Sequence, residues 1–202
     1  IKEKLPFLKK LGIPIIVSIA AEDGPGEFGI LVKQLDKISE VSAIELNISC
    51  PNIRSHWPEG RGLASYSQSQ KYRLIAQDPK ATYAIVKGVR KATQKTLITK
   101  LSPNVTDITE IALDAESAGS DAVALINTLT GMSIDVQKRR PKIACITGGL
   151  SGPAIRPVAV RMVWEVYQKI KIPIIGMGGI MDTPSALEFF IAGATAVSVG
   201  TA

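Results

Sequence analysis

Short apolar runs alternate with longer segments whose apolar residues recur every three or four positions. The short runs are rich in β-branched residues and are typical of buried strands, whereas the longer spacing is typical of helices that cover one face of a sheet. We therefore expect strands at 13–20, 43–48, 97–101, 122–127, 172–176 and 196–199. We expect five helices: one over 27–41, one that begins at Asp78-Pro79, one from Thr106-Asp107 to Ala118, one over 158–169, and one from Thr183-Pro184 to just before Gly193. The apolar face of the second helix uses Tyr83, Val86 and Val89, which we expect to point inward.

This strand–helix alternation predicts an α/β protein with a parallel sheet. An open doubly wound sheet and a closed barrel both fit the alternation. The last two strands end in Gly176-Met177-Gly178-Gly179 and Gly200-Thr201, where barrels commonly bind phosphate, and no Gly-x-Gly-x-x-Gly follows the first strand. We expect a (β/α)₈ TIM barrel with about six of its eight β/α units present in one partial domain, 1–202, and the other two before Ile1.

Composition narrows the function classes. The chain has 202 residues, 46% of them hydrophobic, and no apolar run as long as the ~18–20 residues that span a bilayer. Its formal charge of +6 is scattered without interleaved aromatic residues, which disfavours a nucleic-acid surface. The two cysteines match neither a disulfide framework nor a zinc site, so we expect no metal and a cytoplasmic location.

Polar and glycine residues gather where the expected strands end. They are Asn47, Cys50 and Asn52; Lys100, Ser102 and Asn104; Asn127 and Thr128; Gly178 and Gly179; Gly200 and Thr201. A barrel brings such positions to one rim. Lys100 is flanked by apolar residues, and a buried ammonium needs an anionic or strongly accepting partner.

Each of these residues also has a plainer interpretation. A lone cysteine is often a small buried hydrophobe, which is what we expect of Cys145. The asparagines could satisfy loop backbone, and Gly178-Gly179 could be only a tight turn. It is the joint pattern at successive strand ends that favours a site.

The motifs together resemble one family. The matching stretches are Asn47-Ile48-Ser49-Cys50-Pro51-Asn52, Lys100-Leu101-Ser102-Pro103-Asn104, Ile126-Asn127-Thr128, Gly148-Gly149-Leu150-Ser151-Gly152-Pro153-Ala154, Gly176-Met177-Gly178-Gly179 and Gly200-Thr201. They resemble dihydroorotate dehydrogenase, and most closely the class 1 catalytic subunit of the NAD-linked type. The resemblance implies an FMN-dependent oxidation of dihydroorotate to orotate in pyrimidine biosynthesis.

The resemblance also implies a role for each matched residue. Cys50 is the expected general base, which takes the C5 proton while hydride leaves C6 for the flavin. The expected FMN contacts are Asn47, Lys100, Ile126, Gly152, Gly178, Gly179, Gly200 and Thr201. The expected substrate contacts are Asn47, Asn52, Asn127 and Thr128. A homodimer and a partner subunit with FAD and a 2Fe–2S cluster, which passes electrons to NAD, are implied as well.

Against the family pattern, we expect the chain to be a fragment that lacks the N-terminal part and the C-terminal helix. It also departs from the pattern within its own length. Ser18 stands where many relatives have an asparagine that contacts the flavin. The segment 53–77 is longer than expected, either as a solvated insertion or as a modified active-site loop. Three other functions stay open: a related FMN barrel dehydrogenase that acts on other dihydropyrimidines, a phosphate-binding lyase or isomerase, and a non-catalytic paralogue.

Overall fold

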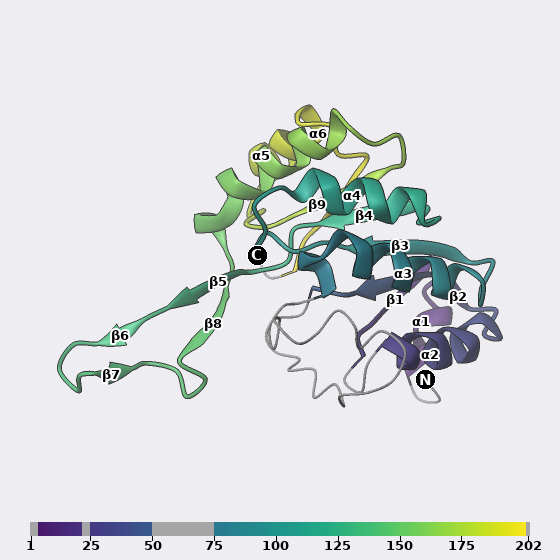
Figure 1. Cartoon of the computed structure of the whole chain (residues 1–202), viewed down its shortest axis with the longest axis horizontal. Coiled ribbons are helices and arrows are strands. Elements are labelled where there is room, and N and C mark those ends of the chain that lie inside the picture. Colours follow the sequence, from purple (N-terminus) through teal and green to yellow (C-terminus); the bar gives the residue numbers. More distant parts are fainter. Residues whose placement is uncertain (1–3, 22–24, 50–74, 201–202) are drawn as a thin grey trace.

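The computed structural model describes residues 4–21, 25–49 and 75–200. Six parallel strands form one curled sheet with the order β1-β2-β3-β4-β9-β10, so neighbours in the sheet follow one another along the chain (Figure 1). The strands are β1 (Ile15–Ile19), β2 (Val41–Asn47), β3 (Thr96–Lys100), β4 (Ala122–Leu125), β9 (Ile174–Met177) and β10 (Ala196–Ser198). This sheet confirms the α/β class and corresponds to part of a (β/α)₈ barrel.

Helices cover one face of this sheet. They are α1 (Lys4–Lys9), α2 (Pro25–Asp36), α3 (Pro79–Arg90), α4 (Ile108–Ser117), α5 (Arg156–Tyr167) and α6 (Thr183–Ile191), with 3-10 turns η2 (Ile75–Gln77) and η3 (Pro153–Ile155). Two apolar clusters join the helices to the strands, one around α2 and α3 and one around α4, α5 and α6. A smaller cluster that includes Ala43, Ile98 and Ala124 lies on the other, concave face.

Successive side chains along each strand point to opposite faces of the sheet. In β2, Ile44 and Leu46 are buried in the cluster under the helices, whereas Ala43 belongs to the concave cluster. Because side chains alternate along a strand, Glu45 and Asn47 share the concave face with Ala43. The same strand therefore supplies both the packed layer and the polar residues of the interior.

Capping residues begin and end several helices. The Asp78 carboxylate accepts the backbone N–H groups of Lys80 at 2.9 Å and Ala81 at 3.2 Å at the start of α3. Asp107 caps α4 in the same way, and Asp182 forms a reciprocal capping box with Ser185 at the start of α6. Gly119 has φ +102° after α4, which favours glycine.

Two expectations about the helices are wrong. The helix expected over 27–41 ends at Asp36, because Val41 is buried as the first residue of β2 and pairs with Ile15 of β1. Tyr83 was expected to face inward from α3, but it is 39% exposed, and Thr82 and Ile85 are buried there instead. The remaining elements agree with the predicted segments and differ at their ends.

An antiparallel arm projects from the carboxyl end of β4 and was not predicted. It consists of β5 (Leu129–Met132) paired with β8 (Thr147–Leu150) and β6 (Ile134–Asp135) paired with β7 (Arg140–Pro141) (Figure 1). Cys145 lies in this arm and is exposed, so the expectation that it is a buried hydrophobe is wrong. Within the described ranges, no helix combines the length and apolarity needed to cross a membrane.

Candidate active site

The carboxyl ends of the central strands meet at one edge of the sheet. Asn47 at the end of β2 pairs with Lys100 at the end of β3, and Lys100 pairs with Ala124 of β4. Leu125, the last residue of β4, pairs with Gly176 of β9. This parallel register brings the predicted strand-end residues of four strands together although the chain separates them widely.

Asn127 connects the end of β4 to the end of β2. Its Nδ2 donates to Asn47 Oδ1 at 3.2 Å, to the backbone oxygen of Ser49 at 3.1 Å and to Ser49 Oγ at 2.8 Å. The Ser49 hydroxyl in turn donates to Asn47 Oδ1 at 3.1 Å. The structure thus confirms that Asn47 and Asn127 lie together, and it adds buried Ser49, which the sequence showed only as a member of the matching motif.

Asn104 holds the base of the arm against this edge. Its Nδ2 donates to the backbone oxygen of Thr128 at 3.0 Å and to Ser102 Oγ at 3.1 Å, while its Oδ1 accepts the N–H of Thr130 at 2.8 Å. The Thr128 N–H donates to Asn127 Oδ1 at 2.8 Å. Thr128 is therefore fixed through its backbone, and its hydroxyl lies next to Gly149 of β8.

Lys100 has the anionic partner that its apolar flanks predict. Its Nζ lies 3.7 Å from Glu45 Oε1, and that oxygen accepts the Ser18 hydroxyl at 2.6 Å. Glu45 is 9% exposed. Sequence reasoning missed this carboxylate, although an acidic residue inside the apolar run 43–48 is itself the signal. The Ser18 hydroxyl, at the expected flavin-contact position, binds Glu45.

Glycines at the end of β9 approach the chain before α5 closely. Gly178 and Gly179 have φ +129° and +73°, and Gly152 has φ +83°. A Cβ on Gly179 would lie 2.5 Å from the backbone oxygen of Gly152 and 3.0 Å from Pro153 Cα. A Cβ on Gly178 would lie 3.6 Å from Cγ1 of buried Ile126. Ile126, Gly152, Gly178 and Gly179 therefore lie close together, and the positive φ of the three glycines is a conformation that favours glycine.

The remaining predicted site residues lie at the end of β10, after β2 and in the segment that follows. Gly200 is exposed after β10. Cys50, Asn52, Thr201 and most of the segment 53–77 lie outside the described residues, apart from η2 at its end. The N–H of Ala76 in η2 donates to the backbone oxygen of Ile48 at 3.2 Å, so the chain returns beside the end of β2.

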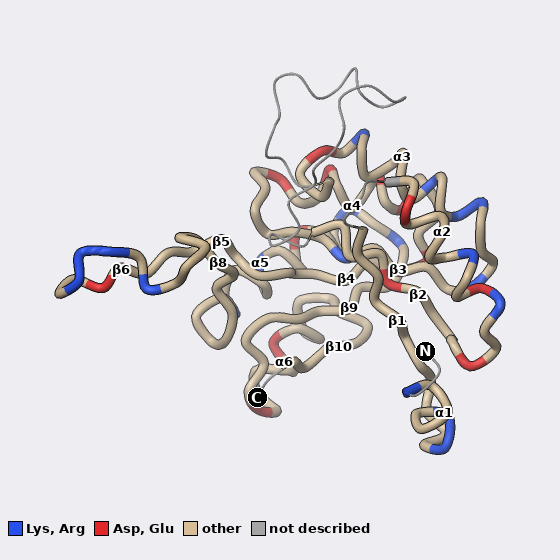
Figure 2. The backbone as a smooth tube through the Cα atoms, turned by 90° about the horizontal axis from the view of Figure 1, so that it is seen from below, with Lys and Arg blue, Asp and Glu red and all other residues tan. Residues whose placement is uncertain are grey.

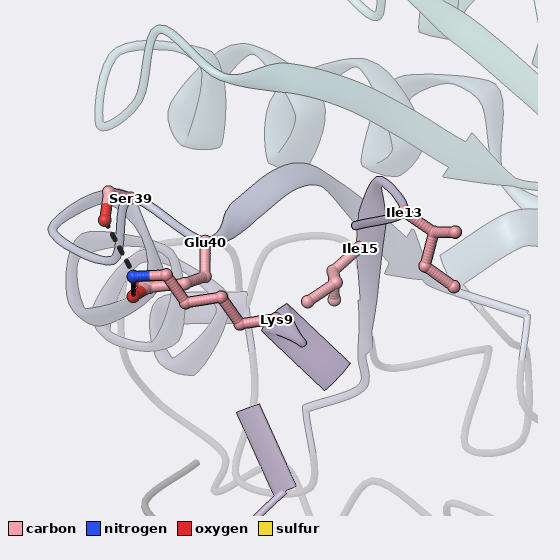
Figure 3. Close-up of a pocket in the computed structure, with 5 residues that line it drawn as sticks. All are labelled: Lys9, Ile13, Ile15, Ser39 and Glu40. Carbon is pink, nitrogen blue, oxygen red and sulfur yellow. Dashed lines mark hydrogen bonds and ion pairs between the residues drawn. The ribbon is translucent and has the colours of Figure 1, made fainter. Parts of the chain in front are cut away.

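A small pocket lies at the opposite, amino edge of the sheet. Lys9, Ile13, Ile15, Ser39 and Glu40 line it (Figure 3). Lys9 Nζ donates to Glu40 Oε1 at 2.9 Å, and this hydrogen bond, together with those from the Glu40 backbone and Ser39, lowers the pKa of Glu40 to about 2. Figure 2 shows Lys and Arg positions on the arm, near α1 and near α2 and α3.

Comparison with known proteins decides the family. A family model described as dihydroorotate dehydrogenase matches residues 1–202. The chain belongs to the dihydroorotate dehydrogenase family. This family consists of flavin-dependent dehydrogenases with a TIM-barrel fold.

Two curated relatives carry the same name. The chain is 52% identical over 202 residues to the "Dihydroorotate dehydrogenase B (NAD(+)), catalytic subunit" of Geotalea uraniireducens and 51% identical to that of Geobacter sulfurreducens. Each match covers 100% of this chain and 61% of the relative. The chain therefore spans about three fifths of the relatives' length. The name "catalytic subunit" implies a partner subunit for those proteins.

A solved structure supports the fold alone. The FabK M276A mutant from Thermotoga maritima matches with a TM-score of 0.52 and 17% identity, over 97% of this chain and 48% of that one. This likeness agrees with a curled parallel sheet that forms part of a barrel.

Proposed function

We propose that this chain is part of an enzyme that oxidises dihydroorotate to orotate with bound FMN. The observation that carries the proposal is the convergence, in a chain of this family, of Asn47, Asn127, Lys100 and a glycine-lined turn at one edge of the sheet. The carboxyl edge is where parallel barrels bind their ligands.

The residues present fit FMN. The backbones of Gly179 and Gly152 lie so close together that a Cβ on Gly179 has no room. A backbone without side chains is the kind of surface whose N–H groups can approach a phosphate. Lys100 offers a cation beside the strand end, where it would favour negative charge on the reduced flavin. Asn47, Lys100, Ile126, Gly152, Gly178, Gly179, Gly200 and Thr201 are the residues that we expect to hold the cofactor. FMN, when bound, supplies the acceptor for the two electrons.

The amide-bearing residues suit a flat, polar pyrimidine. Asn47, Asn127, Thr128 and Asn52 would donate to and accept from the ring and its carboxylate. Cys50 would remove the proton from C5, because a thiolate in an electropositive site has a pKa close to the working pH. Asn127 supports this role indirectly, since it binds Ser49, the residue before Cys50.

The electron path would continue through a second protein. The two cysteines of this chain are fewer than the four thiolates of an iron–sulfur cluster. We infer that a partner subunit with FAD and a 2Fe–2S cluster takes the electrons to NAD, and that the catalytic chain forms a homodimer.

Anaerobic spectroscopy of the full-length protein tests the proposal. We expect a yellow protein whose visible absorption bleaches on addition of dihydroorotate. Cys50→Ala should slow the bleaching by about 10²–10⁴, whereas Cys145→Ala, a control at the exposed thiol of the arm, should leave it unchanged. A colourless protein, or bleaching by dihydrouracil and not by dihydroorotate, would refute the proposal.

A further inference from the structure

Glu45 is a buried carboxylate that the proposed reaction does not use. It is 9% exposed and lies on the concave face of β2, two residues before Asn47. Ionised carboxylates are almost never buried without a partner, because removal from water is costly. Its partners are the Ser18 hydroxyl at 2.6 Å and the Lys100 ammonium at 3.7 Å.

The geometry of the ion pair leaves Lys100 only partly engaged. Glu45 pairs with Ile98 in the sheet, and Lys100 lies two residues further along β3, beside Asn47. A charge-assisted hydrogen bond between nitrogen and oxygen measures about 2.7–2.9 Å, so the 3.7 Å contact is an attraction without a short bond. The ammonium has three donors and keeps some of them for the carboxyl edge.

We propose that Glu45 is a positioning residue that holds Lys100 at the edge and offsets part of its charge, and so sets how strongly the site favours reduced over oxidised FMN. The proposal rests on the proposed function, because Lys100 must lie beside the flavin. A cation next to the flavin favours the electron-rich reduced form, and a carboxylate behind the cation weakens that preference. The flavin can then accept electrons from the substrate and still release them to a partner.

Glu45→Gln tests this directly, because glutamine keeps the size and an acceptor for Ser18 but removes the charge. We expect the ratio of affinities for reduced and oxidised FMN to rise roughly tenfold, the lower end of the effect of a unit charge at close range. For a two-electron couple this raises the midpoint potential by about 30 mV. Spectroelectrochemical titration of the flavin in the full-length protein measures it without turnover.

Two further variants separate this role from a merely structural one. Glu40→Gln makes the same chemical change at the opposite edge of the sheet, where Glu40 pairs with Lys9, and should leave the potential unchanged. Ser18→Ala removes the hydroxyl that shares the Glu45 charge, so the carboxylate opposes Lys100 more strongly. The ratio of affinities should then fall about twofold, which lowers the potential by about 10 mV.

An unchanged or lowered potential in Glu45→Gln overturns the inference. If that variant does not fold or loses its flavin, Ser18→Ala decides, and an unchanged or raised potential in it overturns the inference as well. Failure of the proposed function looks different: the unsubstituted protein is then colourless, or it is yellow and unaffected by dihydroorotate.

Discussion

Gly179→Ala should damage the site through a close approach of two backbone segments. Gly179 has φ +73°, and an added Cβ would meet the backbone oxygen of Gly152 at 2.5 Å and Arg156 Cβ and Pro153 Cα at 3.0 Å. No side-chain rotation relieves a contact with a backbone oxygen. The turn after β9 or the turn before α5 must therefore shift.

Two separable costs make up the expected loss of stability. A positive φ costs a residue with a Cβ about 1–2 kcal/mol. Overpacking against atoms that cannot move freely typically adds about 1–3 kcal/mol. Gly12 is a matched control, because it has φ +64° but nothing within 4 Å of an added Cβ. We expect Gly12→Ala to lower the free energy of unfolding by about 1–2 kcal/mol, and Gly179→Ala to lower it by about 2–5 kcal/mol.

Urea denaturation of the full-length protein with and without added FMN measures both variants. Bound ligand stabilises a folded protein, so added FMN should raise the unfolding midpoint of Gly12→Ala as much as that of the unsubstituted protein. In Gly179→Ala this rise should be small, because the shifted turn would no longer fit the FMN phosphate that we propose it binds. Equal losses of stability in the two variants, or an undiminished effect of FMN on Gly179→Ala, would show that the close approach does not matter.

Three other substitutions or titrations test the edge and the opposite pocket. Asn127→Asp puts a carboxylate against the backbone oxygen of Ser49 and should lower the free energy of unfolding by about 1–3 kcal/mol, while no loss in urea denaturation would contradict the network. Lys100→Met should weaken FMN binding by about tenfold or more in fluorescence titration, since hydrogen bonds to charged groups contribute about 1.5–3 kcal/mol. The pKa of Glu40, measured by NMR, should be about 2 and return toward 4.5 in Lys9→Ala. Because the folded pKa is lowered, the Glu40 contribution to stability is complete above pH 4.5 and is lost as the pH falls from there toward 2.

Local patterns carried most of the fold. Apolar runs predict the strands at 97–101 and 122–127. Asp78-Pro79 and Thr183-Pro184 predict the starts of α3 and α6, because these signals act within a few residues. The end of α2 was placed wrongly, because an apolar residue such as Val41 fits both a helix face and a buried strand. Pairing with β1 decides between them, and pairing is not a local property.

The sequence did not predict the arm, because the arm has no regular pattern of apolar residues. Its strands are two to four residues long, and apolar residues such as Met132, Ile134 and Leu150 are exposed on it. No buried face imposes an alternation of apolar and polar residues there. Without that alternation, a hairpin of this kind cannot be told from a loop by periodicity.

In the candidate site, too, strand pairing decides what the local sequence leaves open. The need of Lys100 for an anionic partner follows from its apolar neighbours alone, but which carboxylate meets that need follows from register. Pairing of Glu45 with Ile98 brings it diagonally across from Lys100 on the concave face, and a slip of one residue would turn Glu45 toward the helices. The strand-end residues can therefore be predicted from the sequence. The position of the Glu45 carboxylate, two residues before Asn47 on the same strand, can be predicted only when the pairing of the strands is known. Because a buried carboxylate needs a partner on its own face of the sheet, the contact of Glu45 with half-buried Lys100 favours this register over the slipped one.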